Sequence, residues 1–212
     1  MRVLAVRHPA AFFVGTVVLV ASLVPPLHGA ADERFSAHMV QHLLLMLVAA
    51  PFLAWGAPIR LTKGLSKPVV VGALHAAAMW LWHLPVFYDA AMGNPMLHVV
   101  EHGSFLVTAY LFWVVVIGRS GAGDQLRRVA LVFAMTLQSG ALGAIIAFAS
   151  TVLYSSHLDS SAPLTPLEDQ QLAGAIMWVP PGMLYLVVMV VLLWSAFRNY
   201  EAADQMQTVG ER

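Results

Sequence analysis

Long apolar stretches separated by short polar loops repeat along the whole chain. Each stretch holds roughly the 20 apolar residues that a helix needs to cross a bilayer. Glu101 is the only Asp, Glu, Lys or Arg that falls beyond the first or last turn of a stretch. The pattern predicts an all-α integral membrane protein, a bundle of six transmembrane helices at about 10–27, 36–55, 69–90, 95–117, 129–152 and 166–196.

The composition also indicates a membrane protein, and no linker divides the chain into domains. The 212 residues are 59% hydrophobic and only 10% charged, which is too apolar for a soluble domain. We therefore expect a single transmembrane helical domain over 1–212, with a short polar tail at about 198–212 that is disordered from Glu201. The first stretch also resembles a signal peptide, but His28 at the −3 position of the plausible cleavage site favours a retained span.

The distribution of charge predicts the orientation. Basic residues concentrate in cytoplasmic loops of membrane proteins, and ten of the eleven here fall on one side of the predicted bundle, Arg34 being the exception. We expect both termini to be cytoplasmic, in a multi-pass protein of the plasma (inner) membrane. The net charge of zero gives no indication of nucleic acid. The ten basic residues on the predicted cytoplasmic side are Arg2, Arg7, Arg60, Lys63, Lys67, Arg119, Arg127, Arg128, Arg198 and Arg212. The loops on the opposite side carry the acidic residues Asp32, Glu33, Asp89, Asp159, Glu168 and Asp169.

Local signals mark where helices begin and break. Asn94 before a proline is typical of an N-cap, and Thr165 with Glu168 three residues later is typical of a capping box. Pro85 and the pair at 180–181 predict breaks in the third and sixth spans. Small residues along one side of the fifth span predict close helix packing: Thr136, Gly140, Gly143, Ala144 and Ala147.

Histidines form the most unusual pattern in these spans. Two pairs are spaced i, i+4, so each pair lies on one face of its helix, near the predicted outer surface. At 1.5 Å rise per residue, one histidine from each of three helices lies about 9–10 Å below the outer surface. This layer contains His42, His83 and His102, and a layer about one turn higher contains His38, His98 and, at its edge, Asp169. His28 and His157 are expected in or beside the outer loops, and His75 in packing contacts.

Metal binding is our preferred interpretation of the paired imidazoles, because polar groups within a membrane are costly unless they bind or relay something. Structural hydrogen bonds at helix starts, or to Glu101 and Asp169, remain the alternative. The chain has no cysteine, so thiolate sites are excluded, whereas Met39 and Met177 offer thioethers. This ligand set favours copper, as Cu(I). Glu101 is expected either to fix the tautomer of an imidazole or to relay protons.

Several longer motifs resemble one family, the CtaG-type cytochrome c oxidase assembly factors of bacteria. The resemblance covers nearly the whole chain, from about 30 to 195. It rests on 36–44 (SAHMVQHLL) ending in Ala50-Pro51, 80–85 (WLWHLP) with Tyr88-Asp89, 98–102 (HVVEH) running on to Phe112-Trp113, and 168–174 (EDQQLAG) followed by Met177-Trp178.

The resemblance implies a membrane protein needed to mature haem–copper oxidases, which handles copper for the catalytic subunit. We expect cytochrome c oxidase subunits and copper chaperones as partners, with membrane lipid around the helices. A haem-binding redox or haem-delivery protein is the alternative, and a metal or proton transporter using Glu101 is a weaker one. No nucleophile–base pair or phosphate loop is present, so we do not expect an enzyme. By motif position, the expected ligands are His38, His42, His83, His98 and His102.

Overall fold

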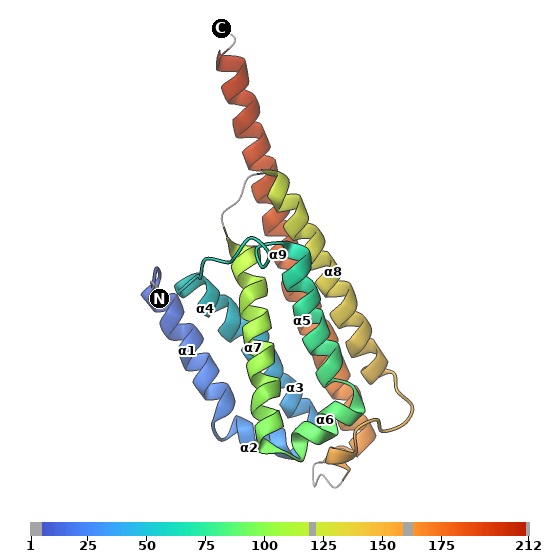
Figure 1. Cartoon of the computed structure of the whole chain (residues 1–212). Helices are drawn as coiled ribbons and strands as arrows, with labels where there is room; N and C mark the ends of the chain where they lie inside the picture. The colour runs from blue at the N-terminus through green and yellow to red at the C-terminus, as the bar shows by residue number, and fades with distance from the viewer. Residues whose placement is uncertain (1–5, 119–121, 159–162, 211–212) are drawn as a thin grey trace.

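The computed structural model describes residues 6–118, 122–158 and 163–210, and every regular element in these ranges is helical. The longer helices run side by side along one axis, whereas the short α2 and α6 lie across one end of the bundle (Figure 1). A π-helical segment, Leu44–Ala49, joins α3 to α4, and a 3-10 turn, Ser155–His157, precedes α9. The α-helices are α1 (Pro9–Leu23), α2 (Leu27–Glu33), α3 (Phe35–Leu43), α4 (Ala50–Gly56), α5 (Pro68–Trp82), α6 (Pro85–Met92), α7 (Pro95–Ile117), α8 (Ala122–Ala147) and α9 (Pro166–Gly210).

The helices are long and apolar enough to make this a helical membrane protein. Within the described residues, four continuous stretches meet the length and hydropathy of a membrane span: Phe35–Gly56, Pro95–Ile117, Asp124–Ala147 and Pro166–Arg198. Two bent pairs, α1 with α2 (43°) and α5 with α6 (73°), raise the number to six if each pair is one span. The predicted all-α fold is confirmed, and the count lies between four and six.

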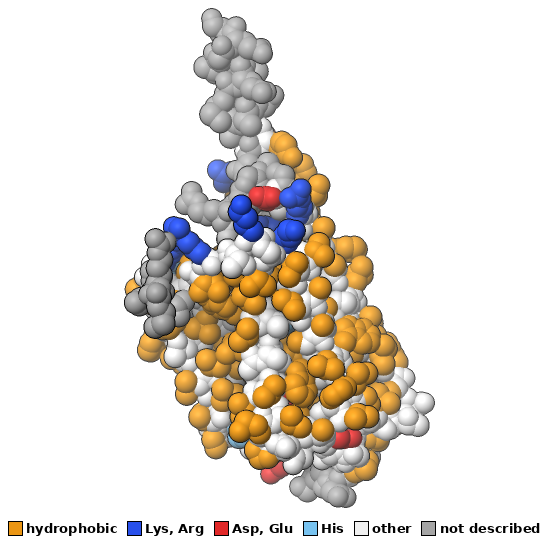
Figure 2. Space-filling view, viewed as in Figure 1, with side chains coloured by type: hydrophobic (Ala, Val, Ile, Leu, Met, Phe, Trp, Pro, Cys, Tyr) orange, Lys and Arg blue, Asp and Glu red, His pale blue; other side chains and the backbone are white. Residues whose placement is uncertain are grey.

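Charged side chains separate to the two ends of the bundle. Figure 2 shows apolar side chains along its sides, Lys and Arg with one acidic side chain near the end from which α9 projects, and further acidic side chains at the opposite end. The basic end carries exposed Arg60, Lys63 and Arg127. Of the residues used above to predict orientation, Arg2, Arg119, Asp159 and Arg212 lie outside the described residues. We refer to the α2–α6 end, where the histidine pairs lie, as the acidic end.

The two predicted helix starts are confirmed. Asn94 Oδ1 accepts hydrogen bonds from the backbone N–H groups of Met96 (2.9 Å) and Leu97 (3.3 Å) at the start of α7. At α9, the Thr165 N–H donates to Glu168 Oε2 at 2.8 Å, and the Glu168 N–H donates back to Thr165 Oγ1 at 3.3 Å. Both caps fix where a helix enters the apolar layer.

Prolines have three different outcomes in the structure. At Pro85 the chain turns by 73° between α5 and α6, as predicted. By contrast α9 continues through Pro180 and Pro181 without interruption, so the predicted break is wrong. In the π-helical segment, residue 51 should donate to the Met46 carbonyl, but a proline has no N–H. Trp113 Nε1 takes its place, donating to that carbonyl at 2.8 Å.

Helix α9 is also longer than predicted. It extends to Gly210, so the expectation of disorder from Glu201 is wrong up to that residue. Its membrane-spanning part packs closely against α8, where a Cβ added at Gly174 would lie 2.3 Å from the Ala147 backbone nitrogen. One added at Gly143 would lie 2.9 Å from the Gly174 carbonyl oxygen. The small-residue side of α8 therefore lets two backbones meet, as predicted.

Candidate metal centre

The first histidine pair is held by helix α3. His38 and His42 lie one turn apart, with ring centroids separated by 4.3 Å. The start of α3 is capped from α9, because Asp169 Oδ2 accepts hydrogen bonds from the backbone N–H groups of Phe35 (2.8 Å) and Ser36 (3.3 Å). The Ser36 hydroxyl donates to the other carboxylate oxygen. Asp169 was expected at the edge of the upper histidine layer, and in the structure its carboxylate caps the start of α3.

The second pair is held by α7. The rings of His98 and His102 are 4.3 Å apart, and His102 Nδ1 lies 3.1 Å from the His98 carbonyl oxygen. As that carbonyl can only accept, the bond places the proton on Nδ1 and leaves Nε2 of His102 as an electron-pair donor. Such a nitrogen is suited to bind a cation.

Helices α3 and α7 bring the two pairs together. Ring centroids of His38 lie 5.2 Å from His98 and 5.5 Å from His102, and those of His42 and His102 lie 5.0 Å apart. Ligand atoms of His38, His98 and His102 all lie within 4.8 Å of one another, and so do those of His38, His42 and Glu101. We call these five residues the histidine cluster: His38, His42, His98, His102 and Glu101.

Four of the five residues of the histidine cluster are buried, His98 being half-buried, and many of its polar atoms have no hydrogen-bond partner. His38, His42 and Glu101 are at most 1% exposed, and His102 is 8% exposed. Among the described residues, the buried side-chain atoms without a hydrogen bond concentrate here, including both ring nitrogens of His38 and of His42 and both Glu101 oxygens. Leaving such atoms unpaired costs about 1–3 kcal/mol each, so a cation shared among them would remove a large penalty.

His83 does not join the histidine cluster. It ends α5, where its Nδ1 lies 2.6 Å from the Met79 carbonyl oxygen, and its ring centroid is 6.0 Å from that of His42. Within the predicted layer of three imidazoles, His42 contacts His102 at 5.0 Å, whereas His83 lies farther away and packs beside Phe105. The position of a histidine along its helix predicts its depth in the membrane. Helix rotation and the bend at Pro85 decide which of the rings are in contact.

A group of aromatic rings covers the histidine cluster at the acidic end. Phe35, Tyr88 and Tyr154 pack together with centroids 4.4–5.0 Å apart, and Tyr88 also contacts His38 at 5.4 Å. The Tyr88 hydroxyl lies 2.8 Å from His157 Nε2, and the Tyr154 hydroxyl donates to the His83 carbonyl at 2.9 Å. The turn at 155–157 is further held by Asp89, whose carboxylate accepts four hydrogen bonds from Ser155 and Ser156.

The open side of the histidine cluster faces α1 and α2. His28, which the sequence placed only in or near an outer loop, stacks on His98 at 5.9 Å and lies 4.0 Å from Asp32. A cavity of about 400 Å³ is lined by His28, His98 and His102 together with apolar residues of α1 and α7. The side chain of His28 is 39% exposed, so an ion can reach the buried rings past it. In the sequence, the spacing of His28 and Asp32 by one helical turn was the feature that could have indicated a role for His28 at this site.

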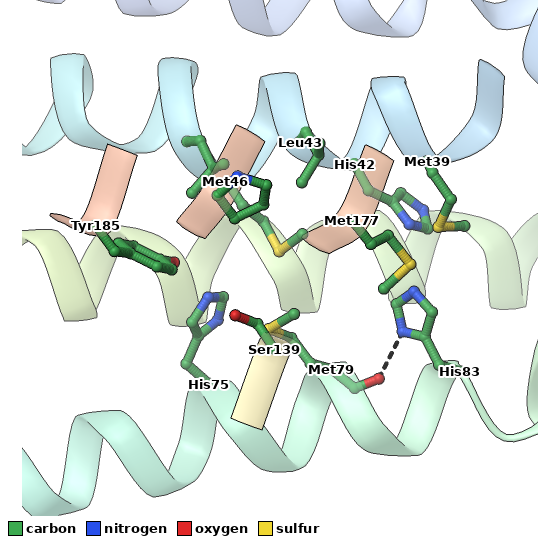
Figure 3. A pocket seen from close by; sticks show the side chains of 12 residues that line it. Met39, His42, Leu43, Met46, His75, Met79, His83, Ser139, Met177 and Tyr185 are labelled. Carbon is green, nitrogen blue, oxygen red and sulfur yellow. Dashed lines mark hydrogen bonds between the residues drawn. The ribbon is translucent and has the colours of Figure 1, made fainter. Parts of the chain in front are cut away.

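The remaining predicted residues lie beside the histidine cluster. Glu101 was expected beside an imidazole, and it lies 3.7 Å from His42 Nε2, with an oxygen close enough to share an ion with His38 and His42. Met39 and Met177 are 1% and 4% exposed and line a small cavity with His42 and His83 (Figure 3). His75 stays in the core, its Nδ1 2.9 Å from Thr108 Oγ1, as expected for a packing residue.

Comparisons with known proteins identify the family. No solved structure matches the chain. Uncharacterized proteins of Mycobacterium bovis and Mycobacterium tuberculosis are each 23% identical over 217 residues, covering 86% of this chain. The chain spans only 33% of the length of these relatives. The family model for the cytochrome c oxidase caa3 assembly factor matches residues 2–199. The chain therefore belongs to the cytochrome c oxidase caa3 assembly factor family.

Proposed function

We propose that this protein carries copper for a haem–copper cytochrome c oxidase, binding it as Cu(I) in the histidine cluster and passing it to an oxidase subunit. The observation that carries the proposal is a group of three buried imidazoles, one half-buried imidazole and one buried carboxylate, whose unpaired ligand atoms lie within 4.8 Å of one another in two overlapping groups of three. Family membership supplies the oxidase as the partner. Copper chaperones are the proposed donors.

Charge balance favours a monovalent ion. The histidine cluster contains one carboxylate, Glu101, among four imidazoles that can bind as neutral ligands. One Cu(I) with one carboxylate leaves the buried centre without net charge, whereas a divalent ion leaves an uncompensated positive charge in an apolar surrounding. Imidazole binds copper well, and nearby thioethers increase the preference for its reduced form.

The proposed orientation places the histidine cluster on the outer side of the plasma (inner) membrane. The basic end, with Arg60, Lys63 and Arg127, would face the cytoplasm according to the positive-inside rule. The acidic end would then face outward, where Asp32 beside His28 attracts cations. Copper would enter past His28 and be released along the same side to an oxidase subunit.

Haem binding has less support from the geometry. The cavity lined by both His42 and His83 measures about 10 Å³, enough for about one water molecule or ion and far below the volume of a porphyrin, and the larger cavity beside His102 is lined by neither of them. Phe105 fills the neighbouring volume, with its ring centroid 4.7 Å from that of His42. The purified protein is therefore expected to lack a Soret band, and a Soret band with stoichiometric haem would favour the haem hypothesis.

The decisive experiment counts copper in purified protein loaded anaerobically with Cu(I). A variant with His38→Leu and His102→Leu removes ligands from both three-residue groups while keeping side-chain volume. It should lose the copper equivalent held by the histidine cluster and fail to restore oxidase activity in cells lacking the native protein. His75→Leu, a buried histidine outside the cluster, is the matched control and should retain copper. Unchanged stoichiometry in the double variant would contradict the proposal.

A further inference from the structure

A second set of soft ligands lies next to the histidine cluster, in the small cavity drawn in Figure 3. The sulfur atoms of Met39 and Met177 point into the space beside the rings of His42 and His83. These side chains come from α3, α5 and α9, so the cavity exists only in the assembled bundle. We propose that His83, Met39 and Met177 form a second metal site, selective for Cu(I), which exchanges its ion with the histidine cluster through His42.

His83 is poised as a ligand of this site. Its Nδ1 is bonded to the Met79 carbonyl at 2.6 Å, so that nitrogen carries the proton and Nε2 holds the free electron pair. That Nε2 atom is buried without a hydrogen-bond partner, in a residue only 4% exposed. Figure 3 shows the ring directed toward the Met177 sulfur, with its bonded nitrogen facing away. A cation at this point would satisfy an otherwise unpaired buried nitrogen.

The chemistry of the lining selects the ion. Every residue around the cavity is uncharged at neutral pH when its histidines are neutral, and the lining contains no carboxylate. Two thioethers and an imidazole are soft or intermediate neutral ligands, which favour Cu(I) over Zn²⁺ and Cu²⁺. The cavity, about 10 Å³, has room for a bare ion but not for one that keeps its hydration shell. Among neutral ligands Cu(I) leaves one uncompensated charge and a divalent ion leaves two, so the desolvation penalty favours Cu(I) over divalent ions.

His42 connects the two sites. It belongs to the histidine cluster, with a ligand atom within 4.8 Å of those of His38 and Glu101, and it also lines the cavity with His83. Both of its ring nitrogens lack hydrogen bonds, so either can bind an ion. Movement of Cu(I) between the sites is a ligand exchange, in which one metal–ligand bond forms as another breaks and no electron is transferred. The second site rests on the proposed function only in taking the same cargo.

The test compares copper stoichiometry and sulfur ligation in three forms of the full-length protein in detergent. Loaded anaerobically with Cu(I), the wild type should bind two equivalents and show Cu–S scattering in its X-ray absorption spectrum. The Met39→Leu plus Met177→Leu variant should bind one equivalent without that scattering. Leucine has nearly the volume of methionine, so the fold should persist, and an unchanged elution volume and melting temperature would verify it.

Met79→Leu is the matched control. Met79 lines the same cavity, but its sulfur accepts a hydrogen bond from Gln138 Nε2 at 3.5 Å and points away from His83 in Figure 3. This variant should keep both equivalents and the Cu–S scattering. If the Met39→Leu plus Met177→Leu variant also kept two copper equivalents and the Cu–S scattering, the second site would be rejected.

The two proposals fail in different ways. One equivalent with only nitrogen and oxygen ligands in the wild type would reject the second site and leave the histidine cluster. One equivalent with sulfur ligands, retained in the His38→Leu plus His102→Leu variant, would reject the histidine cluster and leave the second site. No bound copper would reject both. Zn²⁺ should occupy no more than the histidine cluster, and a second equivalent of zinc would contradict the selectivity proposed here.

Discussion

His42 Nε2 lies 3.7 Å from Glu101 Oε1, and both side chains are fully buried between α3 and α7. This separation is too long for a normal hydrogen bond, yet Oε1 and Oε2 of Glu101 have no other hydrogen-bond partner. A buried charged carboxylate without a hydrogen-bond partner is costly, unless a cation lies beside it. The geometry of this pair therefore fits two ligands of a shared ion better than it fits a direct salt bridge.

Replacing Glu101 with glutamine should weaken Cu(I) binding by about 10- to 100-fold, the range typical of lost supporting charge at metal sites. The substitution keeps the shape but removes the only negative charge of the histidine cluster. Affinity is measured by competition with a chromophoric Cu(I) chelator. Glu168→Gln, at an exposed capping box, should bind copper like the wild type. Equal affinities in the two variants would show that the Glu101 charge does not act on the ion.

Replacing Asp169 with alanine should lower the free energy of unfolding by about 1–2 kcal/mol, as for the loss of a helix cap. Its carboxylate accepts the backbone N–H groups of Phe35 and Ser36, which have no other cap in α3. Thermal melting in detergent measures the change. Asp124→Ala, which removes an exposed carboxylate at the other end of the bundle, should have a smaller effect. A similar melting temperature for both variants would argue against the capping role.

Replacing Gly174 with alanine should disrupt the contact of α8 with α9. The new Cβ would lie 2.3 Å from the Ala147 nitrogen and 2.7 Å from the Gly143 carbonyl oxygen, and backbone atoms cannot move aside without separating the helices. A lower melting temperature and a faster proteolysis rate are expected. Gly182→Ala lies on the same helix with nothing within 4 Å of its Cβ, and should be neutral or stabilising. The reverse order would contradict the packing described.

Replacing Trp113 with phenylalanine should destabilise the π-helical segment by about 1–3 kcal/mol, because the buried Met46 carbonyl then loses its donor. The phenyl ring is also smaller than the indole at this buried position, so a cavity adds to the effect of the missing N–H. Thermal melting is again the measurement. Trp55→Phe is the control, since Trp55 is 49% exposed. An equal, small effect in both variants would mean that water or another group satisfies this carbonyl.

The turn at 155–157 should be sensitive to acid. Burial lowers the pKa of His157 below its usual range, although the Glu33 backbone and the carboxylates of Asp169 and Asp89 act in the opposite direction. Because the folded state prefers the neutral ring, its contribution to stability is complete above about pH 6.5, the unfolded pKa, and is lost as the pH falls from there toward the folded pKa. His157→Gln should show a smaller loss of melting temperature between pH 8 and pH 5. An unchanged pH dependence would exclude His157 as the cause.

Features read along one helix were predictable from the sequence. The apolar stretches gave the helical membrane fold, Asn94 and Thr165 marked helix starts, and the i, i+4 spacing placed each histidine pair on one face. These features depend on helical periodicity and on local hydrogen bonds, which a few neighbouring residues determine. The proline pair at 180–181 and the polar end of α9 were misjudged, because local propensity alone does not decide whether a helix continues.

Relationships between helices required the tertiary structure. Spacing along α3, α5 and α7 gave the depth of each imidazole but not the rotation of its helix, so it did not show that His42 and His83 share a cavity with Met39 and Met177. In the same way Asp169 caps α3 from a distance of 134 residues in the sequence, and His28 reaches His98 only because α2 folds against α7. Sequence alone determined which chemical groups enter the membrane; packing between helices decided which of them face one another, because rotation and bending are fixed by contacts that no single helix contains.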